Sequence, residues 1–192
     1  MTVAPLSDRI ARILYSKEEI DRRVGELAAA IVEDYTVGRA GKDEQGRPLR
    51  LICILRGALI FAADLARRLT IPIEYDLMSV SSYGNGTAPG AVRLINDLEM
   101  PIEGRDVLIV EDIIDTGYTI DYLKRSLEAR RPASIRVCTL IDKVSRRKIP
   151  ADIDYAGLAL EEDAFIVGYG MDYGELYRNL PFIGVLKPEY IQ

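Results

Sequence analysis

The segment Val107-Leu-Ile-Val-Glu-Asp-Ile-Ile-Asp-Thr-Gly-Tyr-Thr119 decides the fold of this chain. Its opening run 107–110 is apolar and too short for a helix, which predicts a strand that is buried on both faces. The carboxylates of Glu111 and Asp112 follow that run, and a helical pattern begins after the glycine. The apolar positions of the helical pattern are Ile120, Leu123 and Leu127. The segment therefore predicts a strand, a polar loop and a helix in direct succession.

The same alternation of short apolar runs and helical patterns extends over most of the chain. Apolar runs predict further strands at 51–55, 73–80, 91–95, 135–141, 157–160, 165–167 and 182–185. Helical spacing predicts one helix behind the capping box Ser16-Lys17-Glu18-Glu19 and another over 58–69. The stretch 38–48 carries three glycines, a proline and alternating charges, which predicts a solvated loop. Strands flanked by helices predict an α/β fold, with a mostly parallel sheet and helices on both faces.

The composition excludes several classes of function. The chain has 192 residues, a length that predicts a single domain spanning 1–192. Its 25 basic and 30 acidic residues give a formal net charge of −5, which argues against broad binding to nucleic acids or anionic membranes. The chain has no histidine, so Ser-His-Asp triads and His-ligated metal sites are excluded.

Other features bear on the compartment. Cys53 and Cys138 stand alone within apolar runs, which predicts buried, reduced thiols. The N-terminus has no apolar core of signal-peptide length, and no apolar stretch is long enough to span a membrane. We therefore expect a cytoplasmic protein.

The loop after residue 110 combines two kinds of group that suit a sugar phosphate. Glu111 and Asp112 can accept hydrogen bonds from a vicinal diol or approach a magnesium ion. The stretch 115–119 supplies hydroxyls and successive backbone N–H groups at a helix N-terminus, which favour an anion. Gly117 permits the tight backbone in which those amides converge. The alternative interpretation is an acidic loop with an ordinary helix cap, because Asp and Thr are good caps.

The stretch 107–119 resembles the phosphoribosyl-pyrophosphate signature of the type I phosphoribosyltransferases, and Asp115-Thr116-Gly117 is most similar to their hypoxanthine-guanine branch. The resemblance runs from about Lys17 to Lys187, with the motifs in order. It implies a mostly parallel sheet with helices on both faces and a small hood formed by the terminal segments. It also implies transfer of the 5-phosphoribosyl group from phosphoribosyl pyrophosphate to hypoxanthine and guanine in purine salvage, with Mg²⁺ as cofactor.

The resemblance gives roles to the residues of the signature. Glu111 and Asp112 would hold the ribose hydroxyls directly or through the metal, and Asp115 would be the general base near N7 of the purine. Asp172 resembles the magnesium-binding carboxylate, so Glu111, Asp112 and Asp172 form the expected metal set. The expected substrate-binding residues of the loop and the helix start are Ile113, Asp115, Thr116, Gly117, Tyr118 and Thr119.

Further motifs carry the resemblance around the pyrophosphate. The turn at Arg56 and Gly57 resembles the pyrophosphate loop, in which the peptide before the basic residue is often cis and the basic residue is often lysine. Ser82 and Tyr83 would open a lid over the active site, and Arg178 would bind pyrophosphate. Taken alone, the turn is an ordinary strand-to-helix connection and the lid segment is a surface loop.

Three residues are implied to recognise the purine. Lys143 would donate to the 6-oxo group and, because an ammonium cannot accept, would favour a carbonyl over an amino group at that position. Phe165 would stack on the ring, and the backbone of Ile166 would contact its edge. Taken alone, Lys143 would be a solvated lysine and Phe165 a core residue. We interpret the nearby run Arg146-Arg147-Lys148 as a solvated face.

Three alternative functions are supported to different degrees by the residues and the net charge of the chain. A phosphoribosyltransferase for xanthine, uracil or orotate is the nearest rival, and Lys143 and Phe165 weigh against the pyrimidines. An RNA-binding regulator built on the same fold would need a basic face, to which a net charge of −5 gives little support. A Rossmann dehydrogenase is excluded because no Gly-x-Gly-x-x-Gly follows an early strand. We expect a homodimer or homotetramer by resemblance, with small-molecule substrates and no nucleic-acid or membrane partner.

Overall fold

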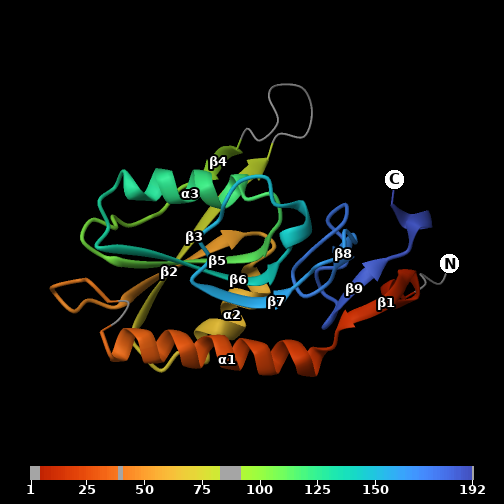
Figure 1. Ribbon diagram of the computed structural model, residues 1–192, viewed down its shortest axis with the longest axis horizontal. Coiled ribbons are helices and arrows are strands. Elements are labelled where there is room, and N and C mark those ends of the chain that lie inside the picture. The colour runs from red at the N-terminus through yellow and green to blue at the C-terminus, as the bar shows by residue number, and fades with distance from the viewer. Residues whose placement is uncertain (1–4, 39–40, 83–91, 192) are drawn as a thin grey trace.

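The computed structural model describes residues 5–38, 41–82 and 92–191, and a six-stranded sheet forms its centre (Figure 1). The strand order is β4-β3-β2-β5-β6-β7. The strands are β2 Leu49–Leu55, β3 Ile73–Ser82, β4 Val92–Asn96, β5 Asp106–Ile114, β6 Ser134–Asp142 and β7 Tyr155–Ala159. Neighbouring strands pair in parallel except for β3 and β4, which are antiparallel. The predicted α/β fold with a mostly parallel sheet is confirmed.

Helices cover both faces of this sheet. Helices α1 (Lys17–Thr36) and α2 (Leu59–Ala66) lie on one face and α3 (Tyr118–Glu128) lies on the other (Figure 1). The predicted capping box begins α1: the Ser16 hydroxyl accepts from the Glu19 N–H at 3.2 Å, and the Glu19 carboxylate accepts from the Ser16 N–H at 2.8 Å. The apolar faces of the helices fill two cores, one on each side of the sheet. The buried residues that α3 contributes are Ile120, Leu123 and Leu127, as predicted.

Strands from the two ends of the chain form a small second sheet in the order β1-β9-β8. Strand β1 (Ile10–Tyr15) pairs antiparallel with β9 (Ile183–Leu186), which pairs antiparallel with β8 (Ile166–Val167). This sheet is the hood that the resemblance implied. Strand β1 was not predicted, because none of its residues is fully buried and no apolar run therefore marks it. Short 3-10 helices are η1 Leu6–Arg9, η2 Val144–Arg146 and η3 Pro188–Tyr190.

Most strand boundaries differ from the prediction by one or two residues, and two boundaries differ by more. Strand β5 continues to Ile114, so Glu111 and Asp112 lie inside the strand rather than after it. The strand is longer because its pairing with β6 continues to its last residue. Helix α2 ends earlier than predicted, where the chain passes into a turn that closes on the carbonyl of Leu65.

The loop before β2 is anchored to the start of β5. The carboxylate of Asp106, at the start of β5, accepts from the N–H groups of Lys42 and Asp43 at 2.9 Å. The carboxylate of Asp43 pairs with Arg47 at 2.8 Å, and the Asp43 side chain is only 2% exposed. The prediction of a solvated loop holds for the exposed residues Lys42, Glu44, Gln45 and Gly46 but is wrong for the Asp43 side chain. The reason is a partner that is distant in sequence, which local composition does not reveal.

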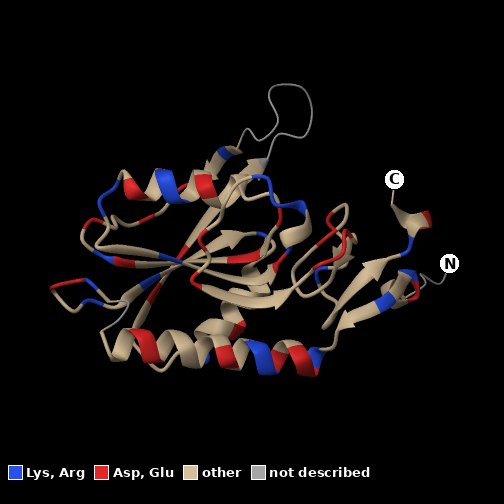
Figure 2. Ribbon diagram, viewed as in Figure 1, with Lys and Arg blue, Asp and Glu red and all other residues tan. Residues whose placement is uncertain are grey.

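The positions of the charged residues and of the two cysteines are as the composition and the sequence pattern predict. Charged residues of both signs alternate along α1 (Figure 2). Cys53 and Cys138 are free and buried, as predicted. Among the described residues, no helix is both long enough and apolar enough to cross a bilayer.

Candidate active site

A cavity of about 210 Å³ opens at the carboxyl ends of β5 and β6, beside the hood. Its lining residues are Asp112, Ile113, Asp115, Lys143, Arg146, Ala164, Phe165, Ile166, Met171 and Asp172. Most of them are site residues predicted from the sequence, and they come from separate stretches of the chain. Parallel strands end at one edge of the sheet, and this edge is where loops of such folds bind ligands. The fold thus brings Asp112, Asp115 and Asp172 to the same cavity as Lys143 and Phe165, whereas Glu111 is not among its described lining residues.

The turn before α3 has the geometry of an anion cradle. Gly117 has a φ of +93°, and a Cβ on it would lie 2.7 Å from the carbonyl oxygen of Ile149, so only glycine fits here. Helix α3 begins at the next residue, Tyr118, and the first N–H groups of a helix have no partner within it. The carbonyl of Thr116 accepts from the Lys148 N–H at 3.0 Å, which holds the turn from below.

Arg147 fastens the backbone just before this turn. Its guanidinium donates to the carbonyl oxygens of Asp115 at 3.0 Å and Ile114 at 3.2 Å, and it pairs with the carboxylate of Asp142. The interpretation of the run 146–148 as a solvated face is therefore wrong for Arg147. The chain turns back through η2 and brings this side chain against the carbonyls at the end of β5. The only signal in the sequence was the repeated basic residue shortly after Lys143.

Glu111 and Asp112 extend toward opposite faces of the sheet because side chains alternate along a strand. Of the two, Asp112 lines the cavity and packs against the backbone of Gly57, where a Cβ would lie 1.9 Å from its Oδ2 atom. Burial raises the pKa of Asp112 to about 6. Burial, with a contribution from the charge of Asp112, raises the pKa of Glu111 well above its usual range. The Glu111 Oε2 atom is buried without a hydrogen-bond partner, and Glu111 is not among the described residues that line the cavity.

Lys143 is a buried cation at the cavity wall. Its side chain is 6% exposed, and its ammonium pairs with the carboxylate of Asp163 at 2.8 Å and donates to the carbonyl oxygen of Ala164 at 3.0 Å. An ammonium has three N–H donors, so one remains for a ligand. The alternative of a solvated lysine at a strand end is wrong.

Arg146 lies between Asp163, the partner of Lys143, and Asp115, the predicted general base. Its guanidinium lies 3.9 Å from the Asp163 carboxylate and 3.6 Å from the Oδ2 atom of Asp115. The other carboxylate oxygen of Asp115, Oδ1, is buried and has no hydrogen-bond partner. Asp115 lines the cavity, and Oδ2 is the oxygen that lies near Arg146. Neither Arg146 nor Asp163 was predicted as a site residue, because their proximity depends on two loops that meet only in the fold.

Phe165 is not a core residue. Its side chain is 41% exposed, and its ring meets that of Tyr173 edge-to-face with the centroids 5.1 Å apart. This contact holds one edge of the Phe165 ring while the ring lines the cavity. Ile166, by contrast, is buried in β8 and lines the same cavity.

A second basic cluster joins the hood to the turn after β2. Arg178 pairs with Asp172 at 2.8 Å and donates to the carbonyl oxygen of Gly170 at 2.8 Å. Glu175 lies 3.5 Å from Arg178 and pairs with Arg56 at 2.7 Å. The peptide between residues 55 and 56 is cis, as the resemblance implied. Arg56 and Arg178, the predicted pyrophosphate-binding arginines, thus both contact the carboxylate of Glu175. Glu175 was not predicted from the sequence.

The expected metal set is not preassembled. Within the described ranges, no three His, Cys, Asp or Glu side chains gather as a group that could hold a metal ion. Glu111, Asp112 and Asp172 therefore do not form a three-carboxylate cluster in this structure, and their role as metal ligands stays a prediction. The charge of Asp172 nevertheless acts on Asp112, so these two carboxylates lie near one another. A hard cation here would need further oxygens from a ligand.

The lid residues are only partly described. Ser82 ends β3, which pairs with β4 up to this residue. Tyr83 lies outside the described residues, as does the rest of the predicted lid up to Thr87.

Comparison with known proteins places these features among relatives. Residues 12–174 match the family described as the phosphoribosyl transferase domain. The chain is 46% identical over 184 residues to the hypoxanthine-guanine phosphoribosyltransferase of Mycobacterium avium, which covers 95% of this chain and 89% of the relative. Its fold is similar to the crystal structure of a hypoxanthine phosphoribosyltransferase from Staphylococcus aureus, with a TM-score of 0.88, 40% identity and full coverage of both chains. It is also similar to the Trypanosoma cruzi hypoxanthine phosphoribosyltransferase in complex with the product IMP, with a TM-score of 0.87, 40% identity and coverage of 97% of this chain and 100% of that one.

Proposed function

Because the chain belongs to the phosphoribosyl transferase family, we propose that its cavity carries out the reaction of a hypoxanthine-guanine phosphoribosyltransferase. The enzyme transfers the 5-phosphoribosyl group of phosphoribosyl pyrophosphate to hypoxanthine or guanine and releases pyrophosphate. The products IMP and GMP make this a step of purine salvage. The observation that carries the proposal is the buried ammonium of Lys143, which faces the same cavity as Phe165 and the signature loop.

The purine binds between Lys143 and Phe165. The free N–H of the Lys143 ammonium donates to the 6-oxo group, while the exposed face of Phe165 stacks on the ring. An amino group at the same ring position would bring a second donor against the ammonium. The site therefore favours hypoxanthine and guanine over adenine.

The sugar phosphate binds along the signature loop. The turn at Thr116 and Gly117 and the first N–H groups of α3, from Tyr118 and Thr119, receive the 5′-phosphate. Asp112 accepts from the ribose hydroxyls at the cavity wall, and Glu111 approaches them from within the strand.

Arg56 and Arg178 stabilise the leaving pyrophosphate together with the backbone at Gly57. Both guanidiniums now contact Glu175, so each is already held near the turn that would receive the anion. Positive charge placed in advance where negative charge develops lowers the barrier without further reorganisation.

Asp115 acts as the general base. When the purine gains the ribosyl group at N9, the ring must lose a proton. Asp115 lines the cavity, and its ion pair with Arg146 orients the carboxylate. A carboxylate in hydrogen-bond reach of the ring can take that proton.

Mg²⁺ suits the donors of this site, since they are carboxylate oxygens with neither histidine nor a thiol among them. Asp172 and Asp112 would hold the ion on the protein side, and Glu111 would approach it from the strand. When bound, the ion neutralises charge on the pyrophosphate.

The assembly and compartment follow from the same family membership. We propose that residues 1–192 act as one domain and that the enzyme is a homodimer or homotetramer with small-molecule substrates. No nucleic-acid or membrane partner is expected. Two free, buried thiols support a cytoplasmic location.

An assay of base specificity tests the proposal. The purified chain is incubated with phosphoribosyl pyrophosphate and Mg²⁺ and, in turn, with hypoxanthine, guanine, xanthine, adenine or uracil, and pyrophosphate release is measured. We expect turnover with hypoxanthine and guanine and little with adenine or uracil. Turnover with uracil alone, or with no base, would overturn the assignment.

A further inference from the structure

The carboxylate of Glu175 joins the two arginines that the proposed function assigns to pyrophosphate. Its Oε2 atom lies 2.7 Å from Nη1 of Arg56 and 3.5 Å from Nη2 of Arg178. The two arginines come from different parts of the fold, since Arg56 lies in the turn after β2 and Arg178 follows the hood strand β8. Arginine binds carboxylate and phosphate oxygens through the same kind of hydrogen bond, so a phosphate oxygen can take the place of this carboxylate oxygen.

This bridge lies beside the catalytic cavity. Arg178 pairs with Asp172 at 2.8 Å, and Asp172 lines that cavity. Arg56 precedes Gly57, whose backbone packs against Asp112, a second lining residue. The bridging carboxylate is therefore at the edge of the cavity where the proposed function places the pyrophosphate.

Of the two carboxylates that contact Arg178, that of Glu175 is held more loosely. Asp172 lies 2.8 Å from Nη2 of Arg178 and its side chain is 29% exposed, whereas Glu175 lies 3.5 Å from the same atom and is 64% exposed. Arg56, the other partner of Glu175, is exposed as well. Ion pairs between exposed side chains contribute little free energy, so an anion of higher charge can displace the Glu175 carboxylate at small cost.

The backbone holds Glu175 in a conformation that favours glycine. Tyr173 and Leu176 pair across a two-residue turn formed by Gly174 and Glu175, whose φ angles are +58° and +65°. Such turns prefer glycine because the left-handed region is unfavourable for a side chain. The Glu175 N–H donates to the Asp172 carboxylate at 2.9 Å, which fixes the turn. The turn itself gives no reason for a glutamate, whereas the contacts of its carboxylate do.

We propose that Glu175 sets the affinity for pyrophosphate, because its carboxylate occupies the place between Arg56 and Arg178 that an oxygen of bound pyrophosphate takes. This inference rests on the proposed function. Binding of pyrophosphate displaces the carboxylate from both guanidiniums, and release of pyrophosphate lets the carboxylate return. Glu175 therefore weakens the binding of pyrophosphate and favours its release.

Titration of inorganic pyrophosphate into the full chain with Mg²⁺, followed by calorimetry, tests this inference. Without a nucleotide the pyrophosphate cannot react, so the measurement reports binding alone. Glu175→Gln keeps the shape of the side chain and removes its charge, and we expect it to bind pyrophosphate about 3- to 10-fold more tightly than the wild type, because two exposed ion pairs no longer compete. Glu175→Gly should show the same gain, and its melting temperature should not fall because glycine suits the turn.

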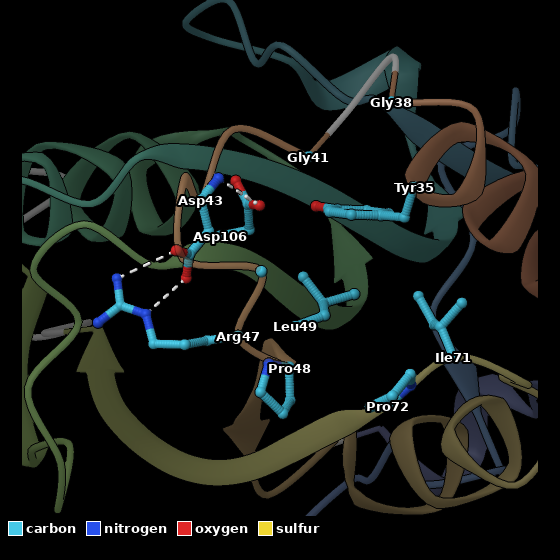
Figure 3. Close-up of a pocket in the computed structure, with 11 residues that line it drawn as sticks. Tyr35, Gly38, Gly41, Asp43, Arg47, Pro48, Leu49, Ile71, Pro72 and Asp106 are labelled. Carbon is cyan, nitrogen blue, oxygen red and sulfur yellow. Dashed lines mark hydrogen bonds and ion pairs between the residues drawn. The ribbon is translucent and has the colours of Figure 1, made fainter.

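Two further variants separate a local effect from a change in net charge. Glu103→Gln is the matched control, because Glu103 is an equally exposed carboxylate in an ion pair at 2.9 Å. It precedes Gly104 at the opposite end of the sheet, where Arg47 donates to the Gly104 carbonyl oxygen (Figure 3), so the affinity should stay unchanged. In an Arg56→Gln background, Glu175→Gln should gain less, because one of its two partners is already absent.

The inference is overturned if the wild type binds pyrophosphate and Glu175→Gln binds it with unchanged or lower affinity. A lower affinity would mean that Glu175 holds the arginines ready for the anion instead of competing with it. An equal gain in Glu103→Gln would also overturn it. If none of these proteins binds pyrophosphate, the pyrophosphate site of the proposed function is wrong and the inference fails with it, a result that differs from binding without a gain.

Discussion

The ammonium of Lys143 lies 2.8 Å from the carboxylate of Asp163, which lies on the loop just before Phe165. The same carboxylate lies 3.9 Å from Arg146, whose guanidinium reaches Asp115 at 3.6 Å. Lys143 is buried whereas Asp163 is 67% exposed, so Asp163 supplies the counter-charge that allows the cation to stay at the cavity wall. Under the proposed function, Asp163 is therefore a positioning residue for the Lys143 ammonium.

Asp163→Asn should weaken base binding selectively. The amide keeps the shape but removes the charge that holds the Lys143 ammonium in place. Because Asp163 is largely exposed, we expect a moderate rise, about 3- to 10-fold, in the KM for hypoxanthine. The KM for phosphoribosyl pyrophosphate should change less than about twofold. Steady-state kinetics with each substrate varied in turn will measure both, and Asp163→Glu should restore part of the loss. A rise in both KM values together would indicate a general disturbance of the fold instead.

Lys143→Gln should relax the choice of base. Glutamine both donates and accepts, so it no longer penalises an amino group at the 6-position. We expect the ratio of kcat/KM for hypoxanthine over adenine to fall by one order of magnitude or more. The measurement is that ratio in the variant and in the wild type. An unchanged ratio would show that Lys143 does not select the base.

Asp115→Asn should slow the chemical step while substrate binding is kept. The amide is similar in volume but cannot accept the purine proton, and general-base catalysis typically contributes about 10²–10⁴-fold. We expect a loss near the low end, because water can partly replace the carboxylate. The Kd for phosphoribosyl pyrophosphate should stay near normal. Helix α3 has its N-cap at Gly117 without a side-chain hydrogen bond, so the alternative of a helix cap at Asp115 is wrong. An unchanged kcat in the variant would contradict the role of general base.

Removal of divalent cations should abolish turnover. The described residues offer oxygen ligands in small number, so the ion must be bound largely through the substrate. We expect EDTA to stop the reaction, Mg²⁺ or Mn²⁺ to restore it, and Zn²⁺ to be unnecessary. Full activity in metal-free buffer would contradict the role given to Asp172 and Asp112.

Asp112→Asn should stabilise the unliganded protein at alkaline pH. Burial raises the folded-state pKa of Asp112 to about 6, above that of the unfolded chain. The ionised carboxylate therefore opposes folding, and stability falls as pH rises from about 4 to about 6. In EDTA at pH 8, we expect the variant to gain about 1–3 kcal/mol in the free energy of unfolding, with the gain lost near pH 4. Urea unfolding at the two pH values will measure this. An equal gain at both would point to a cause other than ionisation.

Several site residues could be predicted because their signal is local. The strand, polar loop and glycine of the 107–119 segment follow one another directly, and Gly117 has the positive φ and the crowded surroundings that only glycine tolerates. The capping box of α1 and the inner face of α3 are equally local patterns. Strand β1 was not predicted because it pairs through its backbone and none of its side chains is fully buried. The contacts of Arg147 and Asp163 were not predicted because their partners belong to other segments of the chain.

The sequence by itself determined which chemical groups the protein contains. It also determined the order of the helices and strands, because hydrophobic periodicity, caps and glycines act over a few residues. It therefore predicted the α/β layers and the anion cradle, whereas the role of Asp115 as general base came from the resemblance to the type I phosphoribosyltransferases. Only the tertiary structure decided that Glu111 and Asp112 face opposite sides of one strand and that Lys143 is buried beside Asp163. It also decided that Asp106 anchors the loop before β2 through the backbone of Lys42 and Asp43 (Figure 3). These relationships depend on contacts between residues far apart in the chain, whose charge pairing and burial exist only once the sheet has brought them together.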